Sequence, residues 1–125
     1  MIKFVIPLQP ISKKNSQQIF VNSKTGKPFI APSRKFKEYE AAAAWFIPKN
    51  KTIDTPVNIQ CLFFMKNRQK CDLTNMLEAI DDVMVKVGLL ADDNYTIVRS
   101  HDGSRILHDK DHPRTEVYID FLKDE

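Results

Sequence analysis

The chain has little of what marks secreted, redox or membrane-spanning proteins. Its 125 residues include two cysteines, three glycines and one tryptophan. Two cysteines without a Cys-x-x-Cys pair are too few for a disulfide scaffold and do not indicate a redox site. The longest uncharged apolar run, residues 4–11, contains two prolines, whereas a membrane helix needs about 20 apolar residues. A small-residue cleavage site of a signal peptide is also missing. We therefore expect a soluble intracellular protein.

The histidines do not supply a structural metal site either, because His101, His108 and His112 have no zinc-like spacing to the cysteines. Apolar residues make up 42% of the chain and charged residues 28%, which is ordinary for a globular protein. A chain of this length buries roughly two-thirds of its unfolded surface. The length therefore favours a single domain spanning residues 1–125.

Acidic residues are scarce in the first part of the chain. Residues 1–71 carry 13 Lys and Arg but 3 Asp and Glu, whereas residues 72–125 carry 6 and 13. A basic part suits a polyanion, since neutralised phosphates release counterions. An acidic part suits a divalent cation if its carboxylates converge. The asymmetry makes the chain a candidate metal-dependent nuclease, and charges spread over a solvated surface are the alternative.

The hydrophobic pattern predicts an α+β domain, a mixed β-sheet packed against two helices. A glycine-containing turn at residues 22–27 indicates a hairpin, and Ser33 is a good helix N-cap. The expected strands are 2–8, 18–21, 28–30, 56–65, 95–100 and 115–121. The first expected helix opens at Pro32-Ser33 and is ended by Pro48, and the second spans 73–87. Apolar stripes at helical spacing predict buried side chains in both helices: Phe36, Tyr39, Ala43 and Phe46, then Met76, Ile80, Val83, Met84 and Val87.

Large aromatic side chains are expected in the core at Trp45, Phe46, Phe63 and Phe64. Ile19 and Phe20 lie in the hairpin instead. An exposed apolar hairpin could insert between bases of branched DNA, although packing within the protein or against a second copy is the more common role of such residues.

Carboxylates gather between residues 72 and 93. Asp72, Asn75, Glu78 and Asp82 follow at steps of three and four and so form one ridge of the second helix. Asp92 and Asp93 come after Gly88, where the chain can turn back beside that helix. Oxygen ligands of this kind suit Mg²⁺, and divalent ions can activate water for phosphodiester hydrolysis. Helix capping by Asp72 and turn formation by the later acids are the alternatives.

These residues resemble a known family. Cys71-Asp72-Leu73-Thr74-Asn75, then Asp82, then Gly88-Leu89-Leu90-Ala91-Asp92-Asp93 is similar to the pattern of the RusA family of Holliday-junction resolvases. The Ile6-Pro7 to Lys13-Lys14 stretch and the Pro32-Ser33 helix start are similar as well. The resemblance implies a small homodimeric α+β endonuclease, often encoded by phages and prophages and acting in the bacterial cytoplasm. It would nick four-way DNA symmetrically with Mg²⁺, or Mn²⁺ in its place.

The resemblance also implies roles for single residues. Asp72 matches the first aspartate of the motif and Asp93 the later catalytic one, with Asp82 and Asp92 as further acids of the site. Thr74 stands where the family usually has an aspartate, and Glu78 where it usually has lysine. Glu78 keeps the number of carboxylates by adding a metal ligand. Lys110 or Arg114 could replace the missing cation and neutralise charge on the phosphate.

The expected partners are four-way or branched DNA and a second copy of the chain, with neither a membrane nor a small-molecule cofactor. Lysine suits contacts to the DNA backbone, which carry little sequence information. The candidate DNA-binding residues are Lys13, Lys14, Lys24, Lys27, Arg68 and Lys70. Three alternatives stay open: a branched-DNA-binding protein that has lost catalysis through Thr74 and Glu78, a nuclease for flaps, forks or RNA, and a phosphate-binding domain with an unrelated partner.

Overall fold

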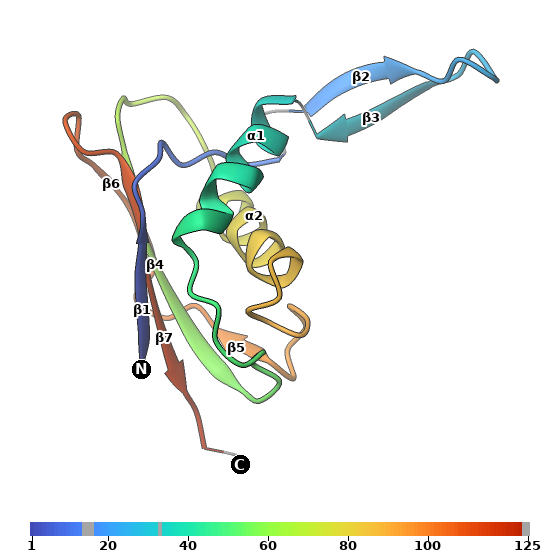
Figure 1. Cartoon of the computed structure of the whole chain (residues 1–125). Helices are drawn as coiled ribbons and strands as arrows, with labels where there is room; N and C mark the ends of the chain where they lie inside the picture. The colour runs from blue at the N-terminus through green and yellow to red at the C-terminus, as the bar shows by residue number, and fades with distance from the viewer. Residues whose placement is uncertain (14–16, 33, 124–125) are drawn as a thin grey trace.

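The computed structural model describes residues 1–13, 17–32 and 34–123. The candidate DNA contact Lys14 and the expected N-cap Ser33 lie outside the described residues. In chain order the elements are β1 (Ile2–Ile6), β2 (Gln17–Val21), β3 (Pro28–Pro32), α1 (Arg34–Ala43), the 3₁₀ turn η2 (Ala44–Phe46), β4 (Val57–Met65), α2 (Leu73–Lys86), β5 (Val98–Ser100), β6 (Arg105–His108) and β7 (Arg114–Phe121). The predicted α+β class, with a mixed sheet and two helices, is confirmed (Figure 1).

The main sheet has the order β1-β7-β4-β5, and β6 also pairs with β4. The last strand, β7, lies between β1 and β4 and is antiparallel to both. Val117 is opposite Phe4 on one side and Cys61 on the other. All three side chains are buried. Because side chains alternate between the faces of a sheet, this row marks the face that carries the core.

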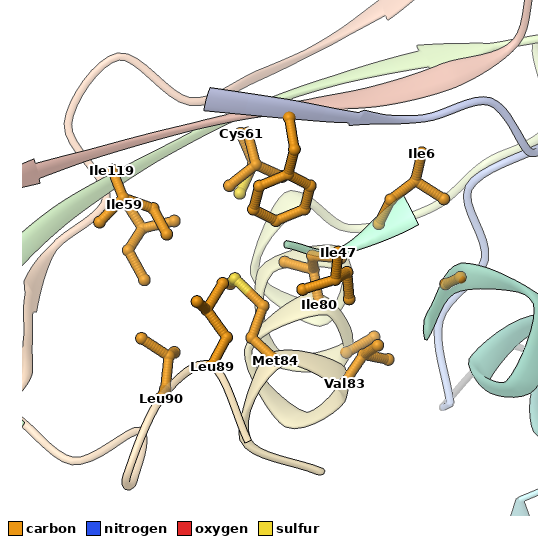
Figure 2. Close-up of a cluster of buried hydrophobic side chains, with 14 of the residues drawn as sticks. Ile6, Ile47, Ile59, Cys61, Ile80, Val83, Met84, Leu89, Leu90 and Ile119 are labelled. Carbon is orange, nitrogen blue, oxygen red and sulfur yellow. The ribbon is translucent and has the colours of Figure 1, made fainter. Parts of the chain in front are cut away.

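Both helices cover that face (Figure 1). α2 packs its apolar stripe, which includes Ile80, Val83 and Met84, toward Ile59 and Cys61 of β4 (Figure 2). Alternate burial along β4, with every second residue from Val57 to Met65 buried, follows from this one-sided cover. No helix among the described residues is both long and apolar enough to cross a bilayer.

Two short strands, β5 and β6, lie one after the other along the same edge of β4. β5 pairs in parallel with its beginning and β6 with its end. The residues between them leave the sheet and are held by side chains, since Cys61 N–H donates to Ser104 Oγ at 2.9 Å and Gln60 Nε2 donates to the Gly103 carbonyl at 3.1 Å. The sequence pattern missed β6 and placed a longer strand at 95–100, of which only Val98–Ser100 forms.

The hairpin β2–β3 projects away from the sheet and helices as an arm (Figure 1). Its strands pair with one another as a separate two-stranded sheet. Phe20 and Phe29 stack across it with ring centroids 5.7 Å apart, and Ile19 is 73% exposed. The predicted hairpin is confirmed, and the side chains of Ile19, Phe20, Val21 and Phe29 are exposed rather than buried in the body.

Four burial predictions are wrong. Trp45 is 87% exposed, and Phe46 and Val87 are also exposed. The helical spacing ends at Ala43, because the chain tightens into η2 and side chains there no longer follow the stripe. Asp81, expected off the buried stripe of α2, is in contrast 5% exposed.

Candidate active site

The end of α2 determines where the next segment, the acidic loop of residues 91–94, begins. Gly88 has φ +88°, a backbone conformation that favours glycine. Its N–H donates to the Val85 carbonyl, and the N–H of Leu89 donates to that of Met84, both at 3.0 Å. These two bonds form a Schellman cap. The chain therefore reverses at Gly88, as the sequence predicted, and Leu89 and Leu90 return into the core.

The segment before β4 holds this loop in place. The N–H of Ile53 donates to the Leu89 carbonyl at 2.8 Å, and the N–H of Ala91 donates to the Ile53 carbonyl at 2.9 Å. The Thr52 hydroxyl donates to the Gly88 carbonyl at 2.8 Å. Because the backbone on both sides of Leu90 is bonded, Asp92 and Asp93 follow from a fixed point beside the last turns of α2.

The acidic loop, α1, α2 and the segment before β2 surround a hollow of about 340 Å³, which we call the acidic hollow. Its lining consists of Lys13, Glu40, Asp82, Val85, Lys86, Asp92 and Asp93. Three of the carboxylates predicted from the sequence therefore meet here. Glu40 and both lysines join them from segments that the sequence motif does not include.

Asp93 has the most perturbed carboxyl group of this hollow. Burial raises its pKa, and the nearby carboxyl groups of Asp82 and Asp92 raise it further. Like charges held together disfavour ionisation. Asp92 is oriented by its own loop, since it accepts hydrogen bonds from the Asp93 N–H at 2.7 Å and from Asn94 Nδ2 at 3.0 Å. The hollow is therefore a place where a cation would be favoured.

Two lysines already contribute positive charge. Lys13 Nζ lies 2.8 Å from Asp82 Oδ2, with the two side chains 35% and 29% exposed. The hydrogen bond to Asp82 raises the pKa of Lys13. Lys86 Nζ lies 3.3 Å from both carboxylate oxygens of Glu40 and so ties α2 to α1. No local sequence pattern indicates either pair, because the partners are 69 and 46 residues apart.

Asp72 lies elsewhere. It is the N-cap of α2, ten residues before Asp82, which corresponds to about 15 Å along a helix axis. It lines a second hollow of about 660 Å³ with Arg68, Lys70, Cys71 and His108, among others. Asn75 Nδ2 donates to Asp72 Oδ2 at 3.3 Å. The acids predicted to form one site are thus divided between two hollows at opposite ends of α2.

Comparison with known proteins identifies the family. A family model described as "Endodeoxyribonuclease RusA" matches residues 7–120. The chain belongs to the RusA family. It is also similar to the "Crossover junction endodeoxyribonuclease RusA" of Aquifex aeolicus (strain VF5), with 31% identity over 96 residues, 74% of this chain and 72% of the relative. The resemblance inferred from residues 72–93 is confirmed.

The substitutions of the RusA motif also have places in the fold. Thr74 and Glu78 are exposed on α2 between the two hollows. Lys110, a candidate replacement for the motif lysine, is exposed in the turn between β6 and β7. It lines neither the acidic hollow nor the hollow at Asp72.

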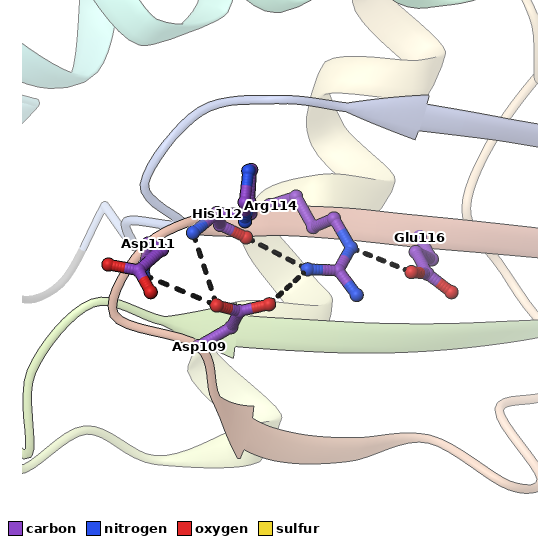
Figure 3. A network of polar contacts seen from close by, with 5 residues as sticks. All are labelled: Asp109, Asp111, His112, Arg114 and Glu116. Carbon is purple, nitrogen blue, oxygen red and sulfur yellow. Dashed lines mark hydrogen bonds and ion pairs between the residues drawn. The ribbon is translucent and has the colours of Figure 1, made fainter.

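Arg114, the other candidate, belongs to a polar network on the face of the sheet that the helices leave uncovered (Figure 3). Its guanidinium donates to Asp109 at 2.9 Å and to Glu116 at 2.7 Å. The same group lies 3.8 Å above the ring centroid of Phe64. The guanidinium of Arg114 is therefore held by side chains of β4, of β7 and of the turn before β7.

The acidic hollow of this RusA-family chain has a donor set that fits a hard divalent ion. Carboxylate oxygens are what Mg²⁺ prefers, and it commonly takes one or two of them together with water and substrate phosphate. Within residues 1–13, 17–32 and 34–123, no three His, Cys, Asp or Glu side chains are grouped closely enough to hold an ion by themselves. The fit is therefore to an open site, at which Asp82 and Asp93 could supply carboxylates.

The remaining candidate DNA contacts lie on two surfaces. Lys24 and Lys27 are exposed on the turn of the arm, where Asn22 Oδ1 accepts the N–H of Lys24 at 2.9 Å. Arg68 and Lys70 are exposed beside Asp72. The basic side chains thus occupy the arm and the N-terminal end of α2, while the acids of the loop occupy its C-terminal end.

Proposed function

We propose that this protein is a divalent-metal-dependent endodeoxyribonuclease that resolves Holliday junctions, or related branched DNA, by paired symmetric nicks during recombination and repair. The observation that carries the proposal is the acidic hollow, in which Asp82, Asp92 and Asp93 meet in a member of the RusA family. Membership of this family and a group of carboxylate oxygens both support hydrolysis of a phosphodiester bond.

Each acid has a distinct part in this proposal. Asp82 and Asp93 would hold Mg²⁺, or Mn²⁺ in its place, and Asp92 orients the loop through its bonds to Asp93 and Asn94. A bound ion would supply an activated water and counter the charge of the phosphate. Glu78, one turn before Asp82, remains a proposed ligand of the same ion, whereas Asp72 would bind metal only at the other hollow, which it lines.

The basic side chains would place the DNA. Lys24 and Lys27 reach outward on the arm, so they suit a branch of the junction beyond the body. Arg68 and Lys70 frame Asp72 and suit backbone phosphates approaching α2. Such contacts position DNA without reading sequence, which agrees with recognition of a branched shape.

A homodimer completes the proposal. Two symmetric nicks need two sites, and a two-fold axis supplies them. The arm is a suitable contact because its apolar side chains, among them Ile19 and Val21, are largely exposed in the single chain. Contact with a second copy and insertion between bases are both consistent with this exposure, and the oligomeric state in solution separates them.

A cleavage assay tests the proposed function. A synthetic four-way junction and a matched linear duplex are incubated with Mg²⁺, Mn²⁺ or EDTA, and the strands are resolved on a denaturing gel. We expect paired nicks in the junction alone, dependent on metal and abolished by Asp93→Asn. Cleavage in EDTA, or unchanged cleavage by Asp93→Asn, would contradict the proposal.

The exposed Thr74 and Glu78, together with the separation of Asp72 from the acidic hollow, favour one other function. A protein of this fold that binds branched DNA without cutting it would bind the junction tightly and leave it intact in either metal. The double variant Thr74→Asp, Glu78→Lys then decides between the two, because cleavage gained in that variant alone identifies the wild type as a catalytically degenerate relative.

A further inference from the structure

Lys13 has a position that a general DNA contact does not need. Its ammonium lies between the two helices, 2.8 Å from Asp82 Oδ2 on α2 and 5.9 Å from the ring centroid of Phe36 on α1. Its side chain is 35% exposed. The ammonium is therefore at the wall of the acidic hollow, with one side open to it.

The chain before Lys13 fixes this position. Pro10 and Ser12 are buried, and Ile11 packs against the core. Gln9 Oε1 accepts the N–H of Lys66 at 2.9 Å, which ties the segment to the end of β4. A lysine on so well-anchored a segment loses less conformational freedom when it holds a ligand.

The charges of the hollow give Lys13 a specific task. Lys86 is paired with Glu40, and the other acids that line the hollow together with Lys13 are Asp82, Asp92 and Asp93. Before DNA binds, these three carboxylates and Lys13 carry a net charge of −2, which one divalent ion neutralises and a second would exceed. An ammonium has three N–H donors. The bond to Asp82 uses one, so two remain for phosphate oxygens.

We infer that Lys13 is a permanent cation of the active site: it stays on Asp82, contacts the phosphate to be cleaved, and limits the site to one divalent ion per chain. The inference rests on the proposed function. It differs from a DNA-positioning role because Lys13 then acts on the reacting phosphate, where preorganised positive charge stabilises the transition state.

Metal binding gives a readout that does not depend on cleavage. Mn²⁺ is titrated into the full-length wild type and Lys13→Met by calorimetry, with circular dichroism to verify folding. We expect one ion per chain in the wild type, and in Lys13→Met either a second ion or at least tenfold tighter binding, because a like charge is removed from beside the ion. The same stoichiometry and affinity in both proteins would overturn the inference.

Kinetics supply the second readout. Lys13→Met should lower kcat on the four-way junction about 100-fold or more, with less than a threefold change in KM, and Lys13→Arg should recover part of the loss. The matched control is Lys123→Met, an exposed lysine after β7 that does not line the hollow, which should match the wild type. A change in KM alone would make Lys13 an ordinary backbone contact and overturn the inference.

The two proposals fail in different ways. Cleavage lost in Asp93→Asn but kept in Lys13→Met overturns the role of Lys13 and leaves the proposed nuclease intact. A wild type that binds Mn²⁺ without cutting any junction overturns the proposed nuclease, and the Mn²⁺ titration then decides alone whether Lys13 limits the site to one ion.

Discussion

Asp81 and Asp82 are consecutive on α2, yet their carboxylates have different partners and surroundings. Asp82 Oδ2 lies 2.8 Å from Lys13 Nζ at the acidic hollow. Asp81 is buried, and its Oδ2 lies 2.8 Å from Nε2 of His101. The two groups are not aligned as a hydrogen bond, and they form an ion pair when the imidazole ring is protonated. Burial raises the pKa of Asp81, and the contact with His101 acts against that rise. One acid thus belongs to the site and the other to the packing of α2.

Alanine at the two positions should separate these roles. Asp81→Ala should lower the free energy of unfolding by about 1–3 kcal/mol, because it leaves the partly buried His101 without the carboxylate that it contacts. Asp82→Ala should change it by less than about 1 kcal/mol, since Lys13 keeps access to water. Urea denaturation measures both. Equal losses in the two variants would contradict this division.

We expect the Asp93 carboxylate to lower the stability of the metal-free protein. In EDTA at neutral pH, Asp93→Asn should stabilise the protein by a few tenths of a kcal/mol, because it relieves repulsion from Asp82 and Asp92 in a largely solvated place. Mn²⁺ should raise the Tm of the wild type and leave that of the variant unchanged. Thermal melts with and without metal test this, and a variant melting below the wild type in EDTA would argue against repulsion.

We expect Gly88 to be required for its backbone conformation and not because a side chain there would lack space. A Cβ atom there would have no heavy atom within 4 Å, but φ is +88°. Gly88→Ala should therefore cost about 1–2 kcal/mol of unfolding free energy through backbone strain alone. Gly88→Asn should cost less, because asparagine tolerates this conformation better. The comparison needs only urea curves, and an alanine variant as stable as the wild type would exclude strain at this turn.

Glu116 should give stability a pH dependence on the uncovered face of the sheet. The Tyr118 hydroxyl, which donates to Glu116 at 2.7 Å, and Arg114 lower the pKa of Glu116 below 4.5. A lowered pKa contributes stability that is present above about pH 4.5 and is lost as the pH falls through the folded-state value. Glu116→Gln should be about 1 kcal/mol less stable at pH 7, with the difference closing toward pH 3.

The control for that experiment is Asp120→Asn, an exposed carboxylate later in the same strand. Its difference from the wild type should stay small and flat over the same range, because an exposed carboxylate contributes little to stability. Melting curves between pH 7 and pH 3 follow both variants. A gap for Glu116→Gln that widens on acidification would reverse the assigned direction of the shift.

The sequence predicted the parts of the fold whose signal is local. β4 and α2 were expected within one residue of their observed ends, because strict alternation and a helical stripe ending at a glycine both act over short distances. The turn that brings Asp92 toward Asp82 was expected for the same reason. Phe46 was misplaced because a helical stripe was extended past Ala43, where the backbone tightens into η2, and Trp45 because a large aromatic side chain was expected in the core.

The features that the sequence did not predict depend on contacts between residues far apart in the chain. β6 has no clear alternation of its own and becomes a strand because β4 pairs with it. The contact between Lys13 and Asp82 spans 69 residues, so the missing motif cation was sought at Lys110 and Arg114. Charge alone does not say which cation reaches a given carboxylate, since that depends on how the whole chain closes.

The position of β7 has a consequence for how the protein is made. β7 is the last strand to leave the ribosome, and within the described residues it is the strand that holds β1 in the sheet. The segment carrying Lys13 follows β1, so the docking of β1 on β7 brings that segment to the sheet. While β7 is still being synthesised, a growing chain would therefore lack the strand pairing that places Lys13 beside Asp82.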